Sequence, residues 1–154
     1  MRGYAPLFAA ALAFWLGAGG AGRAQTAPHI ATVKTLSGHG TVIDAATGAR
    51  NPAAVGARIH AGDTLVTDTD GAMGVTFLDN TTMSLGPSSE IALARFEYDP
   101  PAARYGFAAR ILRGTFLFVT GQIAKYAPDQ VAVTTPSGSI GIRGTRFLVK
   151  VDAK

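Results

Sequence analysis

The chain has 154 residues, a length that suits one domain with a single hydrophobic core better than two. Hydrophobic residues make up 47% of it and charged residues 16%, a balance that excludes an intrinsically disordered chain. The formal net charge is +4, but the basic residues are mostly scattered, so nucleic acid is not an expected partner. The chain contains no cysteine, which excludes disulfides and a lipid-modified N-terminal cysteine.

The N-terminal segment has the organisation of a secretory signal peptide. Arg2 precedes an apolar run over residues 7–16, and glycine and alanine predominate from there to Ala24. A membrane-spanning helix needs about 20 apolar residues, more than this run provides. We therefore predict a signal peptide over 1–24, cleaved after Ala24. The remaining domain, 25–154, is expected to be periplasmic or secreted and to have no permanent membrane anchor.

Short apolar runs punctuated by glycine predict β-strands throughout the remaining chain. Residues 72–78 alternate between two faces, as in a strand with one buried side. Asp79 and Asn80 follow, and both residue types suit the tight turn of a hairpin. Because the inward pattern resumes twice beyond this turn, we expect at least three short antiparallel strands between residues 64 and 93.

Beyond residue 93 the apolar side chains change parity, which predicts a bulge or a change of sheet. A rigid turn at residues 99–101 and a returning strand over 105–112 complete a predicted hairpin. Aromatic and basic residues alternate in it, and two interpretations stay open: a partly exposed surface for a partner, or core packing. These residues are Phe96, Tyr98, Tyr105, Phe107, Arg95, Arg104 and Arg110.

Residues 115–119 are apolar on both parities, which predicts a strand covered on both faces in the middle of the fold. Two further strands are expected at 131–134 and 147–151. No segment beyond residue 24 has the pattern of a helix of three turns.

The sequence contains no complete catalytic or metal-binding pattern. The three histidines lack the spacing of metal ligands, and Ser139 lacks the Gly-x-Ser-x-Gly context of a hydrolase nucleophile. Acids near turns usually accept backbone hydrogen bonds, so neither of two possible carboxylate pairs indicates acid–base chemistry. These residues are His29, His39, His60, Asp68 with Asp70, and Asp79 with Glu90. We predict no enzymatic activity, no cofactor and no metal.

Three segments carry distinctive motifs in a fixed order. Residues 59–67 contain Gly-Asp-Thr-Leu-Val-Thr, and residues 75–89 contain Phe-Leu-Asp-Asn-Thr-Thr, then Leu-Gly-Pro-Ser-Ser. Residues 133–145 contain Thr-Pro-Ser-Gly and end on Ile-Arg-Gly-Thr. In this order and spacing the segments resemble the FecR domain, a family named after the iron-dicitrate regulator, from about Gly38 to the C-terminus.

The resemblance implies an all-β domain, solenoid-like or sandwich-like, in the periplasm. It also implies a role in sigma/anti-sigma regulation, in which such domains receive a signal from an outer-membrane receptor. The chain departs from that regulator because its sequence contains no cytoplasmic anti-sigma segment and no spanning helix. Asn80 also stands where the family commonly has glycine. The motif residues expected to be structural or partner-binding are Gly62, Asp63, Thr67, Asp79, Thr135, Pro136, Arg143, Gly144 and Thr145.

Arg143 is the most specific of these residues, and two roles stay open for it. A structural role would pair its guanidinium with turn carbonyls or with Asp63 or Asp79. The alternative makes it an exposed contact for a protein partner. We expect an exported, non-catalytic domain that binds a protein of the cell envelope or senses a signal. The alternative is a structural or carbohydrate-binding protein of the envelope.

Overall fold

The computed structural model describes residues 27–142 and 145–152. The elements are β1 (His29–Ser37), β2 (Gly40–Ile43), β3 (Arg50–Pro52), β4 (Arg58–His60), β5 (Thr64–Thr67), β6 (Ala72–Phe77), β7 (Thr82–Leu85), β8 (Glu90–Asp99), η1 (Pro100–Ala102), β9 (Arg104–Val119), α1 (Gln122–Tyr126), η2 (Pro128–Gln130), β10 (Val131–Thr135), β11 (Gly138–Ile140) and β12 (Arg146–Val151). The all-β expectation is confirmed. No helix among these residues is long and apolar enough to cross a membrane.

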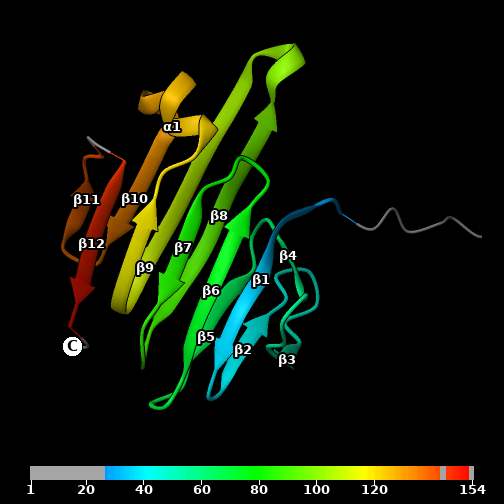
Figure 1. The fold of residues 1–154 in the computed structure, drawn as a ribbon, viewed down its shortest axis with the longest axis vertical. Coiled ribbons are helices and arrows are strands. Elements are labelled where there is room, and N and C mark those ends of the chain that lie inside the picture. The colour runs from blue at the N-terminus through cyan, green and yellow to red at the C-terminus, as the bar shows by residue number, and fades with distance from the viewer. Residues whose placement is uncertain (1–26, 143–144, 153–154) are drawn as a thin grey trace, which may run out of the picture.

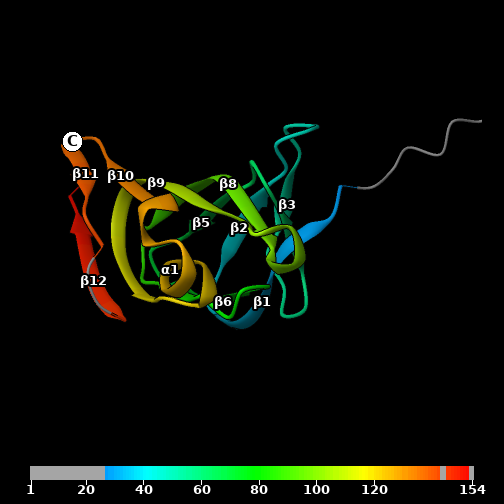
Figure 2. The same ribbon diagram turned by 90° about the horizontal axis from the view of Figure 1, so that it is seen from above.

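The strands form one curled sheet with the order β3-β2-β5-β8-β9-β7-β6-β1-β4. Figure 1 shows the strands side by side, and Figure 2 shows the sheet curling into a half-barrel around its interior. The long strand β9 joins the two halves of the sheet, the one that contains β8 and the one that contains β7. Its first part pairs with β8, and its last residues pair with β7 and β12. Neighbours are antiparallel except β9 and β10, which are parallel. The sequence left solenoid-like and sandwich-like arrangements open, and the structure is this half-barrel.

The strands predicted between residues 64 and 93 are confirmed. Strands β5 to β8 occupy this region, with β6 paired to β7 and β5 paired to β8, both antiparallel. Asn80 has a φ of +64°, as the tight turn between β6 and β7 requires. The predicted irregularity beyond residue 93 is also present, because the register between β8 and β9 shifts between Ala92 and Arg95.

The core lies inside the curl and is built from the alternating apolar side chains of both halves. Phe77 on β6 contacts Phe107 on β9 with ring centroids 5.2 Å apart in an edge-to-face arrangement. Fully buried side chains of this size each stabilise the fold by about 1.5–3 kcal/mol. Other members of the core are Val33, Ile59, Leu65, Met73, Met83, Leu85, Ile91, Ile111 and Phe116.

The expectation that residues 115–119 are covered on both faces is wrong. Phe116 and Phe118 are buried, but Leu117 is only half-buried and Val119 is exposed. The strand does lie between β7 and β12, in the middle of its half of the sheet. The outer face of a curled sheet has no second layer over it, so apolar residues there stay accessible.

Helix α1 lies over the open end of the curl (Figures 1 and 2). Its Ile123 is 1% exposed and belongs to the core, so this side chain packs the helix against the sheet. A five-residue helix has little stability of its own, because nucleation costs more than so few hydrogen bonds return. Contacts made by other segments must therefore hold α1 in place.

Candidate binding cleft beside helix α1

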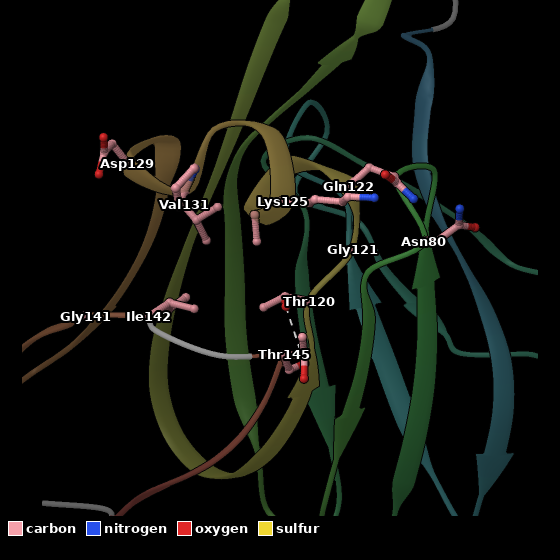
Figure 3. A pocket seen from close by; sticks show the side chains of 12 residues that line it. Asn80, Thr120, Gly121, Gln122, Lys125, Asp129, Val131, Gly141, Ile142 and Thr145 are labelled. Carbon is pink, nitrogen blue, oxygen red and sulfur yellow. Dashed lines mark hydrogen bonds between the residues drawn. The ribbon is translucent and has the colours of Figure 1, made fainter.

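A cleft of about 1050 Å³ lies between α1, the start of β10 and the segment that leads into β12. Figure 3 shows Val131 and Ile142 pointing into it, with polar side chains around the rim. The polar rim residues are Asn80, Gln122, Lys125 and Asp129. An apolar wall surrounded by a few hydrogen-bonding groups is the usual composition of a binding site.

Asp79 holds the first turn of α1, although it lies about 40 residues earlier in the chain. Its carboxylate accepts hydrogen bonds from Thr81 N at 3.0 Å, from Thr81 Oγ1 at 2.8 Å and from Ile123 N at 3.2 Å. Its carbonyl oxygen accepts from Gln122 N at 2.8 Å. Because the carboxylate is fully buried and faces helix amides, it acts as a distant N-terminal cap.

The residues just before α1 are held from two further directions. Gly121 N donates to Thr81 Oγ1 at 3.0 Å, and Thr120 N donates to Thr145 O at 2.8 Å. Thr120 Oγ1 also donates to Thr145 O, and a dashed line marks the hydrogen bond between these two residues in Figure 3. A Cβ on Gly121 would lie 2.3 Å from both Asp79 O and Thr81 N, so this close approach requires glycine.

The second and third motifs therefore meet at the cleft. Asp79 belongs to the second motif and Thr145 to the third, and both hold the segment 120–123 that forms one cleft wall. Arg143 and Gly144 lie outside the described residues. Asp63 and Asp79, the acids expected to pair with Arg143, use their carboxylates on backbone amides.

The first motif builds a different part of the molecule. Asp63 is 3% exposed, and its carboxylate accepts from His60 N at 2.8 Å and from Ala45 N at 3.1 Å. It thus ties the loop between β2 and β3 to the end of β4. Gly62 has a φ of +94°, a left-handed conformation that the turn before Asp63 demands. None of these residues lines the cleft.

Thr67 completes the first motif as a buried connector between β5 and the start of β8. Its Oγ1 donates to Gly86 O at 2.6 Å and accepts from Ser89 N at 3.0 Å. Ser89 is itself buried, and its Oγ accepts from Thr115 N at 3.1 Å. These hydroxyls satisfy backbone groups that the irregular turn at 86–89 leaves unpaired.

Thr135 and Pro136 form the turn between β10 and β11. Thr135 Oγ1 donates to Gly138 O at 3.1 Å and accepts from Ser137 N at 3.3 Å. Pro136 is exposed and occupies the turn itself. Both residues have local structural roles and lie outside the cleft lining.

Strand β12 follows Thr145 and carries an open edge next to the cleft. It pairs with β9, and its other side has no strand partner among the described residues. Leu148 is 69% exposed, and Arg146 and Lys150 flank it on the outward face. Such an edge presents backbone donors and acceptors to an added strand.

The carboxylates considered for acid–base chemistry have other partners. Glu90 faces Arg113 at 3.3 Å, and Asp79 is engaged as described above. Asp70 accepts from His39 Nδ1 at 2.8 Å on the surface, which raises the pKa of His39 and lowers that of Asp70. Among the described residues no three histidines or acids are grouped as metal ligands would be.

The model of the FecR family, described as FecR protein, matches residues 63–154 of the chain. The chain therefore belongs to the FecR family, a family of cell-envelope signalling proteins. The match begins at Asp63 and includes every residue of the cleft wall. No curated protein and no solved structure matched the chain.

The sequence did not point to the polar residues of α1 as part of a site. Gln122, Lys125 and Asp129 lie in a segment with no motif, and α1 is too short for a periodic pattern to be visible. Gly121, just before three residues with good helix propensity, was the available signal.

Proposed function

We propose that this chain is an exported, non-catalytic binding domain that recognises a protein partner in the cell envelope through the cleft and the edge of β12. The observation that carries the proposal is the convergence of two family motifs on the segment 120–123. That segment forms a cleft wall directly beside an open strand edge. Family membership supports a signalling role, and the signal-peptide pattern supports export.

The chemistry of this surface suits an extended peptide segment. Backbone groups along β12 can pair with an added strand, while the apolar wall of the cleft receives a side chain at its end. Arg146 and Lys150 are exposed on the outward face of β12. Lys150 pairs with Asp152 at 3.5 Å, so Arg146 is the charge that favours a partner segment with acidic residues. No bond-making step is needed for this role, in agreement with the absence of a complete catalytic pattern in the sequence.

Site-specific photo-crosslinking in intact cells tests the proposal. A crosslinking amino acid at Gln122 or Leu148 should yield a discrete heavier protein species, because both positions lie on the proposed surface. The matched controls are Val55 and Leu78, which are 64% and 51% exposed but lie elsewhere. Equal crosslinking at control and cleft positions, or none at either, would contradict this binding surface. A protease-resistant, glycan-containing species at Gln122 would favour the carbohydrate-binding alternative at the cleft.

A further inference from the structure

Three tyrosine rings stand in a row at the projecting end of the β8–β9 hairpin, which extends beyond the other strands in Figure 1. Tyr98 and Tyr105 are paired across the two strands, with ring centroids 6.2 Å apart. Tyr126, the last residue of α1, stacks on Tyr105 with centroids 5.9 Å apart and an interplanar angle of 25°. We call these three residues the tyrosine ladder.

The ladder lies just beyond the core, on the same face of the hairpin. The next pair inward is Phe96 with Phe107, and both of these rings contact Phe77 in the core. The two strand tyrosines are half-buried, whereas Tyr126 is 59% exposed. None of the hydrogen bonds among the described residues uses a tyrosine hydroxyl. Tyr126 therefore provides the main accessible ring surface of the ladder, beside tyrosine hydroxyls that no protein group of the described residues engages.

The charges around the hairpin are arranged unequally on its two faces. On the outer face, Arg95 pairs with Glu97 at 2.9 Å and Arg104 pairs with Asp99 at 2.6 Å. On the ladder side, Lys125 Nζ lies 5.6 Å from the centroid of the Tyr126 ring. Lys125 has no carboxylate partner within the described part of the chain. One end of the ladder thus carries an uncompensated positive charge.

We propose that the tyrosine ladder binds a glycan built of pyranose units that bear carboxylate groups. The C–H faces of a pyranose ring are apolar and slightly positive, so they stack on the negative faces of aromatic rings. Tyrosine hydroxyls can donate to and accept from sugar hydroxyls, and the Lys125 ammonium can pair with a sugar carboxylate. None of the three tyrosines lines the cleft proposed above as the protein-binding surface, and Lys125 is the one residue that the two sites share.

A protein partner fits the ladder less well. The buried centre of a protein interface needs well-packed anchors that fill pockets. Tyrosine is a common anchor of this kind, but each ring of the ladder lies against its neighbour, so no single ring projects to fill a pocket of a partner. The ladder offers only ring faces, hydroxyls and one ammonium group, which are the groups that a charged sugar chain recognises.

The distribution of aromatic residues provides a direct probe of this site. The chain has four tyrosines and one tryptophan, and apart from Tyr4 and Trp15 all of them belong to the ladder. In the full chain carrying Tyr4→Phe and Trp15→Phe, tyrosine fluorescence therefore reports on the ladder alone. The ligands to titrate are an oligomer of alternating N-acetylglucosamine and N-acetylmuramic acid, an oligogalacturonate, and a neutral N-acetylglucosamine oligomer.

We expect saturable fluorescence changes with the acidic oligomers and weaker binding of the neutral one. Tyr126→Ala should weaken binding about tenfold, because it removes one stacking surface and one hydroxyl, whereas Tyr126→Phe keeps the ring and should lose less. Lys125→Gln should abolish the preference for acidic sugars and the dependence of affinity on salt. Val55→Ala, an exposed position outside both proposed surfaces, serves as the matched control and should bind like the parent.

Three results would overturn the proposal. One is the absence of a saturable change with all three sugars, and another is an unchanged Kd in Tyr126→Ala. The third is a protein crosslinked through a photo-reactive group at position 126 that the acidic sugars do not displace, which would make the ladder a protein-binding surface. Loss of crosslinking at Gln122 and Leu148 leaves this site unaffected, so the two proposals fail independently.

Discussion

Asp63 and Asp79 are two buried aspartates that perform the same chemistry in different parts of the molecule. Both carboxylates accept hydrogen bonds from backbone amides of a turn and of a segment distant in the chain. Asp63 joins the β2–β3 loop to the end of β4, within the body of the sheet. Asp79 joins the β6–β7 turn to α1, which forms a wall of the cleft. The comparison shows that the segment a buried acid holds, and not the acid itself, separates a structural role from a site-positioning role.

The largest effect is expected from Asp79→Ala. The substitution leaves Ile123 N, Thr81 N and Thr81 Oγ1 without their acceptor in a buried environment, so the free energy of unfolding should fall by about 3 kcal/mol. Urea unfolding measures the loss, and amide hydrogen exchange should accelerate at 121–123. Asp79→Asn keeps one acceptor oxygen and should lose less. Unchanged exchange at these amides would show that α1 is held by Ile123 packing alone.

The second prediction compares two glycines of the cleft. Gly121→Ala places a Cβ against the backbone of Asp79 and Thr81, and we expect a loss of about 2 kcal/mol with weaker partner crosslinking at Gln122. Gly141→Ala is the matched control, because its Cβ would meet no atom within 4 Å. Thermal unfolding of both variants measures the difference. Equal melting temperatures would refute the close approach at Gly121.

Asp63→Ala tests the other half of the comparison. Ala45 is exposed, so water can replace one of the two lost hydrogen bonds, and the expected loss is smaller, about 1.5 kcal/mol. Hydrogen exchange should accelerate at the amides of Ala45 and His60 and stay unchanged at 121–123. Faster exchange in α1 would mean that the hydrogen bonds of Asp63 and those of Asp79 are energetically coupled, and that the two aspartates do not have separate roles.

The smallest effect concerns the surface pair His39–Asp70, where no buried acid is involved. The hydrogen bond to Asp70 raises the pKa of His39 above 6.5, so its stabilisation is present below that pH and is lost as the pH rises through the raised value. The pKa of Asp70 is lowered below 3.8, so its part is lost in strong acid. His39→Ala should therefore melt slightly below the parent at pH 5 and like the parent at pH 9. A larger difference in melting temperature at pH 9 than at pH 5 would show that the stabilisation does not come from the charged His39–Asp70 pair.

Much of the fold could be predicted because alternating apolar residues and turn residues are local signals. The turn at Asp79-Asn80, the irregularity in the region of residue 93 and the hairpin that follows were predicted and are present. The coverage of 115–119 was predicted wrongly because an apolar run does not reveal whether a second layer exists. Of the two interpretations of the aromatic hairpin, core packing is present: Phe107 belongs to the core, and Phe96, Tyr98 and Tyr105 pack against it. The partner surface stays a prediction.

The sequence by itself determined the strand-rich class, the family and the motif residues, because periodicity, turn chemistry and motif order are written along the chain. Only the tertiary structure decided that Asp79 caps α1, that Thr145 holds the residue before Gly121, and that Tyr126 stacks on Tyr105. These contacts join residues separated by between 20 and 45 positions, and Tyr98–Tyr105 depends on the register of two strands. Long-range pairing is set by how the sheet curls, which no local pattern specifies.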